Sequence, residues 1–109
     1  MKKFRLEHFT KGWLVGDFTP NIIETKEFEV GIKYYRAGDK EEKHHHRVAQ
    51  EITAVVSGHF RMGGQELVAG DVVLVERHEA VDFECLADGA TTVIKVPSVK
   101  GDKYLGSSQ

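Results

Sequence analysis

Residues 38–58 read GDKEEKHHHRVAQEITAVVSG and place three consecutive histidines, His44 to His46, just before a strand-like run. In an extended strand, side chains two residues apart point to the same face and lie about 6.6 Å apart along the chain. His44 and His46 therefore lean toward a common point, while His45 faces away. Two imidazoles at this spacing can reach one metal ion at about 2.0–2.1 Å. An internal run of three histidines is also unlike a purification tag, which lies at a terminus.

Glu51 follows His46 by five residues, so in one unbroken strand it would face the wrong way. It can join the histidine pair only if residues 47–50, "RVAQ", break the strand and send Glu51 up a neighbouring one. That tetrapeptide is not a strong turn sequence. The alternative is that "KEEKHHHR" is a solvated loop of mixed charge, and spacing alone leaves both interpretations open because such histidine pairs are common by chance.

The rest of the chain predicts short strands between turns. Residues 28–34 alternate apolar and polar side chains at a period of two, and Gly63-Gly64 between two strand-like runs predicts a hairpin. Further strands are expected at 71–76, 81–86 and 91–97, with the last two joined by a turn at Asp88-Gly89. Helical periodicity is almost absent, and only residues 21–28 could hold a short helical turn. This pattern predicts an all-β fold, a sandwich or small antiparallel barrel of jelly-roll type with little helix.

Composition limits the class of protein. The 109 residues contain 40% hydrophobic and 29% charged side chains with a formal net charge of −2, as in an ordinary globular domain. Neither nucleic acid nor a membrane is indicated as a partner, because there is no basic excess and no apolar run long enough to span a bilayer. The single cysteine, Cys85, cannot form an internal disulfide, and the N-terminus is a poor signal peptide, so we expect a cytoplasmic protein.

The spacing around the histidines extends into a longer pattern. Gly38, His44, His46, Glu51 and Gly58 are separated by five, one, four and six residues. This resembles the first motif of the cupin superfamily, G(x)5HxH(x)3–4E(x)6G, at every fixed position. The resemblance implies a small conserved β-barrel that is commonly a homodimer. It also implies that His44, His46 and Glu51 are three of the four usual ligands of a divalent metal ion, which could be Zn, Fe, Mn or Ni.

The second cupin motif, G(x)5PxG(x)2H, is degenerate. Gly70 begins it, but Glu76, His78 and Val81 stand where the proline, the second glycine and the histidine are expected. His78 is a candidate for the fourth ligand if its turn folds back over the barrel mouth. Three protein ligands and a water are also chemically complete, since catalytic metals keep an open position.

The predicted domain organisation is one cupin barrel over residues 1–105, with its core at about 28–97, an N-terminal segment packed on it, and a flexible tail at 106–109. Homodimerisation has a second argument besides the resemblance. The row Ile52, Ala54 and Val56 is apolar and faces opposite to Glu51, so it needs a cover. A two-fold dimer is the simplest cover, although the segment 4–18 could supply part of it.

Three functional hypotheses remain at this point, because the cupin fold hosts many activities. The first is a metal-dependent enzyme that acts on a small polar molecule. The second is a non-catalytic binding or sensing module, and the third is a structural cupin with a vestigial metal site. The resemblance to stand-alone bacterial cupins suggests a sugar or sugar-nucleotide derivative as the ligand. Candidate substrate-binding residues are Lys33, Tyr35 and Arg61, whereas no catalytic residue can be assigned.

Overall fold

The chain folds as an all-β barrel, as predicted. A computed structural model describes residues 1–107, which form nine strands and two short 3-10 helices. The helices are η1 (Leu6–His8) and η2 (Thr10–Gly12), so the helical turns lie near the N-terminus and not at 21–28. The strands are β1 (Trp13–Gly16), β2 (Ile23–Glu24), β3 (Glu29–Tyr35), β4 (Lys40–His45), β5 (Gln50–Met62), β6 (Gln65–Val68), β7 (Val72–Val75), β8 (Val81–Val96) and β9 (Tyr104–Leu105). None of the helices in this range is long and apolar enough to cross a membrane.

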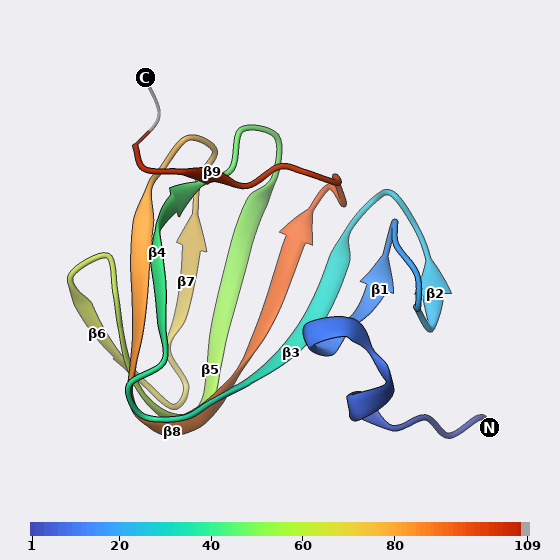
Figure 1. The fold of residues 1–109 in the computed structure, drawn as a ribbon, viewed down its shortest axis with the longest axis horizontal. Helices are drawn as coiled ribbons and strands as arrows, with labels where there is room; N and C mark the ends of the chain where they lie inside the picture. Colours follow the sequence, from blue (N-terminus) through green and yellow to red (C-terminus); the bar gives the residue numbers. More distant parts are fainter. Residues whose placement is uncertain (108–109) are drawn as a thin grey trace.

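Strand β8 joins the walls of the barrel, because it pairs with three other strands among the described residues. It pairs antiparallel with β4 through its first half, with β3 through its second half, and with β5 along most of its length. Strands β6 and β7 continue the sheet from β5, while β1 and β2 extend it beyond β3. Figure 1 shows β8 curving under the barrel, so that its two halves belong to different walls. These pairings close the interior in which the candidate ligands meet.

The predicted turn at Asp88-Gly89 is wrong, because residues 81–96 form one bent strand. At the bend, the register between β5 and β8 shifts around Ser57 and His59. A Cβ on Gly89 would overlap the carbonyl of Ser57, and Gly58 has a φ of +90°. The two glycines therefore serve a close approach of two bent strands, which the sequence signal cannot distinguish from a turn.

The predicted hairpin at Gly63-Gly64 is confirmed. Strands β5 and β6 pair antiparallel up to Met62 and Gln65, which flank the two glycines. Both glycines have positive φ, 56° and 81°. This conformation suits a tight two-residue turn whose twist matches that of the strands.

The barrel interior is divided into an apolar and a polar part. The apolar part is a cluster of buried side chains, on which Tyr35 packs with ring centroids 5.7 Å from Phe60 and 5.0 Å from Phe83; its members are Val55, Phe60, Leu67, Phe83 and Cys85. The polar part contains buried His44, His46, Glu51, Thr53 and Thr91. Buried polar groups are costly unless they are paired, so this second part is where function is to be sought.

The C-terminal segment closes one end of the barrel. Strand β9 pairs with β4, and the backbone N–H of Gly106 donates to the carbonyl of Lys43 at 2.8 Å. Gly106, the first residue of the tail predicted at 106–109, is therefore held by a backbone hydrogen bond. Residues 108–109 of that predicted tail lie outside the described residues.

Candidate metal and ligand site in the barrel

His44 and His46 face each other at the end of β4. Their ring centroids are 5.4 Å apart and the rings are nearly perpendicular, at 88°. Nδ1 of His44 lies 2.8 Å from the carbonyl oxygen of Glu42. Because a carbonyl only accepts, Nδ1 carries a proton, and in the neutral form of the ring the lone pair is on Nε2, which is the tautomer of a metal ligand.

The ring of His46 has a buried nitrogen, Nε2, that is not satisfied by a hydrogen bond to any of the described residues. Burial, reinforced by the charges of Lys95 and His44, lowers the pKa of His46 to about 4, so the ring is neutral at pH 7. A buried polar atom without a partner costs roughly 1–3 kcal/mol, which a bound ligand would recover.

His45 points away from this pair, as the strand alternation predicted. Its Nδ1 donates to the carbonyl of Gly106 at 2.7 Å, and its ring stacks on Tyr104 with centroids 5.5 Å apart. Arg47 also lies over that tyrosine, 3.8 Å from the ring centroid, and its Nε donates to Nε2 of His45 at 3.4 Å. The middle histidine therefore attaches the C-terminal segment to β4.

A buried carboxylate makes the turn that the tetrapeptide "RVAQ" does not predict. Asp102 is 7% exposed, and its oxygens accept hydrogen bonds from the backbone N–H groups of Arg47, Val48 and Ala49 at 2.9 to 3.2 Å. Burial alone would raise the pKa of Asp102, but the three hydrogen bonds outweigh it and lower the pKa. No local signal marks this aspartate in the sequence, since its partners lie more than 50 residues away.

The turn sends Glu51 up the neighbouring strand, β5. There Glu51 lies opposite Val75 of β7 and Lys95 of β8, and it is only 9% exposed. Burial raises the pKa of its carboxyl group, although the charges of Lys95 and His44 oppose the shift. The geometric condition for Glu51 to join the histidines, a break between the strands, is met.

A cavity of about 240 Å³ lies inside the barrel beside these residues. Trp13 covers its β3 wall and packs on Gly31, where a Cβ would come within 2.7 Å of the indole. The cavity is lined by polar His44, Glu51, Thr53 and Thr91, by apolar Met62, Val81, Phe83 and Val93, and by Lys11, Trp13, Lys33, Tyr35, Glu41 and Lys103. Such a mixture of apolar walls and a few polar groups suits a small polar molecule.

The donor types fit a divalent metal ion, but the side chains are not gathered around one point. Over residues 1–107, no group of three or more His, Cys, Asp or Glu side chains lies close enough to hold a metal ion. The two imidazole nitrogens are available, and Glu51 lines the same cavity as His44. Completion of the set requires Glu51 to turn toward the histidines or an exogenous ligand to take its place.

The second-motif residues occupy two different environments. The backbone N–H of His78 donates to the carbonyl of His46 at 2.7 Å, so its turn does fold back to the histidine end. The side chain of His78 is exposed, and φ at this residue is 69°. Val81 lies directly opposite His44 in the β4–β8 pair and lines the cavity. The position that the motif assigns to a histidine is therefore next to the pair.

The three candidate substrate-binding residues do not all lie at the cavity. Lys33 and Tyr35 line the cavity. Arg61 does not line it: its guanidinium is on the surface and pairs with Glu84 at 3.5 Å and with Glu66 at 3.6 Å. The alternation on β5 shifts between Ser57 and Phe60, and this register shift is invisible in the sequence.

Comparisons with known proteins support the fold. Neither a protein-family model nor a curated protein matches the sequence. Among solved structures, an uncharacterised double-stranded β-helix protein from Klebsiella pneumoniae is similar, with 16% identity, a TM-score of 0.72, and coverage of 98% of this chain and 93% of that one. An RmlC-like cupin from Shewanella frigidimarina has 24% identity and a TM-score of 0.65 over 70% of this chain and 71% of its own.

A third similar structure contains a metal. The bacterial pirin YhhW from Escherichia coli, in complex with nickel(II), has 12% identity and a TM-score of 0.67, with coverage of 81% of this chain and 39% of the pirin. At these identities the likeness concerns the fold alone, which is the double-stranded β-helix of the cupins.

Proposed function

We propose that this chain, with its cupin fold, binds a small polar molecule in the barrel cavity beside a divalent metal ion held by His44, His46 and Glu51. The observation that carries the proposal is the buried Nε2 of His46, which lacks a hydrogen-bond partner among the described residues. A neutral imidazole whose buried nitrogen has no hydrogen-bond partner is what a metal ligand requires before the metal binds.

Further support comes from the way in which the protein orients His44 and Glu51, the other two proposed ligands. The Glu42 carbonyl fixes the tautomer of His44, and the turn around Asp102 brings Glu51 to the same cavity. The nickel in the pirin of the same fold is an argument by analogy for a divalent ion. When bound, such a metal would act as a Lewis acid on a carbonyl or hydroxyl oxygen of the ligand.

The protein's own residues have separate roles in this proposal. Thr53 and Thr91 offer hydroxyl groups to the ligand, and Thr91 Oγ1 is itself buried without a partner among residues 1–107. Phe83 and Tyr35, which packs on the apolar cluster, give the cavity an apolar wall. The cavity of about 240 Å³ can enclose a molecule of sugar size, whereas the remainder of a sugar nucleotide would extend outside it. We propose the cytoplasm as the compartment, since the single cysteine is a buried free thiol.

Metal titration of untagged protein tests the proposal. We expect calorimetry with Zn²⁺, Mn²⁺, Fe²⁺ and Ni²⁺ to show one site per chain, and His46→Ala to abolish it. His45→Ala and the surface variant His59→Ala serve as controls and should retain binding, provided that thermal melts show a folded protein. Equal loss in His45→Ala and His46→Ala, both folded, would contradict the proposed ligand set.

The same site suits a non-catalytic binding module and an enzyme, and a test for turnover of the ligand distinguishes the two functions. Candidate sugars and sugar derivatives can be incubated with the metal-loaded protein and followed by nuclear magnetic resonance. Perturbed ligand signals without a new product identify a binding module, and product signals that disappear in His46→Ala identify an enzyme.

A further inference from the structure

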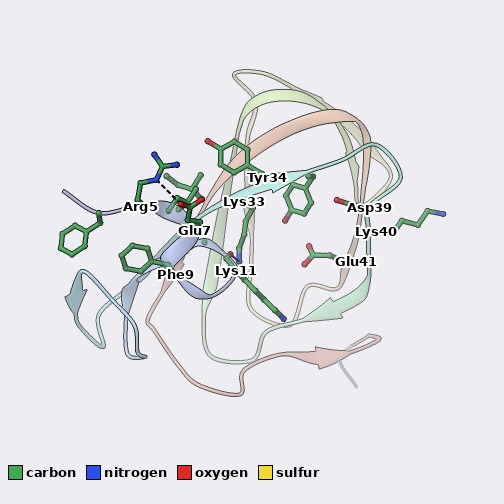
Figure 2. Close-up of a pocket in the computed structure, with 14 residues that line it drawn as sticks. Arg5, Glu7, Phe9, Lys11, Lys33, Tyr34, Asp39, Lys40 and Glu41 are labelled. Atoms are coloured by element: carbon green, nitrogen blue, oxygen red, sulfur yellow. Dashed lines mark hydrogen bonds and ion pairs between the residues drawn. The ribbon is translucent and has the colours of Figure 1, made fainter. Parts of the chain in front are cut away.

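Two hollows meet at one side of the barrel. The inner cavity shares Lys11, Lys33, Tyr35 and Glu41 with a wider surface groove of about 850 Å³ between the N-terminal segment and strands β3 and β4. Figure 2 shows this groove, with Lys11 and Lys33 on the side of the N-terminal segment and the carboxylate of Glu41 facing them from the opposite side. A molecule entering the barrel by this route passes these side chains.

Three lysines line the inner cavity, and two of them stand at the junction. Lys11 and Lys33 line both hollows, whereas Lys103 lines the inner cavity alone, and none of the three forms an ion pair with a carboxylate among the described residues. Lys95 lines neither hollow: its Nζ lies 5.2 Å from the centroid of the Trp13 ring, and it is the cross-strand neighbour of both Glu29 and Glu51. The carboxylates that line the cavity are Glu41 and the buried Glu51. The chain as a whole has a net charge of −2, so this concentration of cations runs against its composition.

Lys33 is the best positioned of the three. Its Nζ donates to the carbonyl of Lys11 at 2.5 Å and lies 4.1 Å from the centroid of the Trp13 ring. These contacts hold the ammonium group at the junction while leaving two of its three protons for a ligand. Burial lowers the pKa of Lys33 to about 8, and the nearby charges of Lys95 and Lys11 act in the same direction, whereas Glu41 and Glu29 oppose it.

We infer that the junction is an oxyanion site, at which Lys33, assisted by Lys11 and Lys103, binds a carboxylate or phosphate group of the small molecule whose remainder enters the barrel. The inference rests on the proposed function, since it names the chemical class of the ligand of the same cavity. An anion would supply the counter-charge that the lysines lack, and a charge-assisted hydrogen bond is about twice as strong as a neutral one. The Trp13 ring beneath the lysines makes the site observable, because it is the only tryptophan in the sequence.

Trp13 fluorescence of the metal-free protein, treated with EDTA and then desalted so that no EDTA remains, tests the inference. Inorganic phosphate and succinate are titrated at constant ionic strength, with uncharged succinamide as the matched probe. We expect a saturable change with at least one of the two anions and none with succinamide. The preferred anion distinguishes a phosphate from a carboxylate ligand. A flat response to both anions would overturn the inference.

The variants localise the effect. Lys33→Met and, independently, Lys103→Gln should each weaken anion binding about tenfold, the equivalent of 1.4 kcal/mol. Lys33→Arg should restore most of it, and Lys43→Gln, an exposed lysine that lines neither hollow, should have no effect. Equal weakening by Lys43→Gln would place the anion elsewhere and overturn the inference. Metal titration of Lys33→Met tests the proposed metal site independently of the anion site. If the variant keeps metal binding and loses anion binding, the two sites are separate; if the parent protein binds the anion but no metal, the proposed function fails and the inference about the anion stands.

Discussion

At the scale of single residues, Val81 decides how many ligands the barrel can offer. It faces His44 across the β4–β8 pair and lines the cavity, so a longer polar side chain there would reach the histidines. We expect Val81→His to tighten metal binding by roughly tenfold or more, since one further ligand contribution of 1.4 kcal/mol has that effect. Competition with a chromogenic chelator measures it. Asp82→His, on the exposed side of the same strand, is the control, and an unchanged affinity in Val81→His would mean that the ligands lie elsewhere.

Lys33 gives the anion site a pH dependence. Its pKa of about 8 is set first by burial, then by Glu41 of β4, Lys95 of β8, Lys11 of the N-terminal segment and Glu29 of its own strand. The cationic form binds the anion and is lost as pH rises, so succinate binding should weaken between about pH 7 and pH 9. Trp13 fluorescence titrations at several pH values measure this. Lys33→Arg keeps its charge in this range, and an identical decline in that variant would assign the titration to another group.

At the scale of the elements, the turn between β4 and β5 depends on one carboxylate. Asp102→Ala removes the acceptor of three backbone N–H groups, of which that of Ala49 is buried and the other two are partly buried, and we expect this to cost roughly 2–4 kcal/mol. The lowered pKa makes this contribution complete near neutral pH and reduces it only as pH falls through the folded-state pKa. Urea denaturation at pH 7 measures the loss.

Asp71→Ala provides a matched comparison for Asp102→Ala. Asp71 accepts one N–H, from Val68, in an exposed turn, so its loss should cost only about 1 kcal/mol. Equal losses in the two variants would mean that the turn at 47–49 is held by something other than Asp102. Metal affinity should fall in Asp102→Ala and not in Asp71→Ala, because only the first turn places Glu51 relative to His46.

The same turn shows what the sequence can and cannot predict. Period-two alternation predicted the orientations of His44, His45 and His46, and the paired glycines predicted the hairpin, because both signals are local. The break at "RVAQ" is made by Asp102, and the bend of β8 is made by the contact of Gly89 with Gly58. Both depend on residues distant in the sequence, so the carboxylate's contribution to the turn and the continuity of β8 could not be read from local patterns.

At the scale of the whole molecule, one sheet face of the barrel is apolar and has no cover among residues 1–107. Ile52 lies between Leu74 and Ile94, and Ala54 lies between Val72 and Thr92. On this face Val56 is 60% exposed, Val72 64% and Leu74 54%. The N-terminal segment does not cover it, since η1, η2 and β1 lie on the side of β3, away from β7 (Figure 1).

We therefore propose that two copies of the chain pack through this face, since isologous dimers are the commonest assembly. A stable dimer would bury more than about 1,200 Å² in total. Light scattering after size exclusion should give twice the chain mass at micromolar concentration. Ala54→Arg, at the centre of the face, should give a monomer or an insoluble protein. Val99→Arg, away from these strands, serves as the control, and a monomeric parent protein would contradict the proposal.

The attachment of β9 to β4 has a consequence for folding of the chain during its synthesis on the ribosome. The histidines are synthesised before β8 and β9, the two strands with which β4 pairs among the described residues, and before Asp102, on which the turn beside them depends. A nascent chain that has just exposed His44 to His46 therefore has neither neighbour for that strand, and such long-range pairings form slowly. For that interval the histidines are solvent-exposed on an unpaired segment, and the barrel interior that receives a metal and its ligand takes shape only after residues 102–106 emerge.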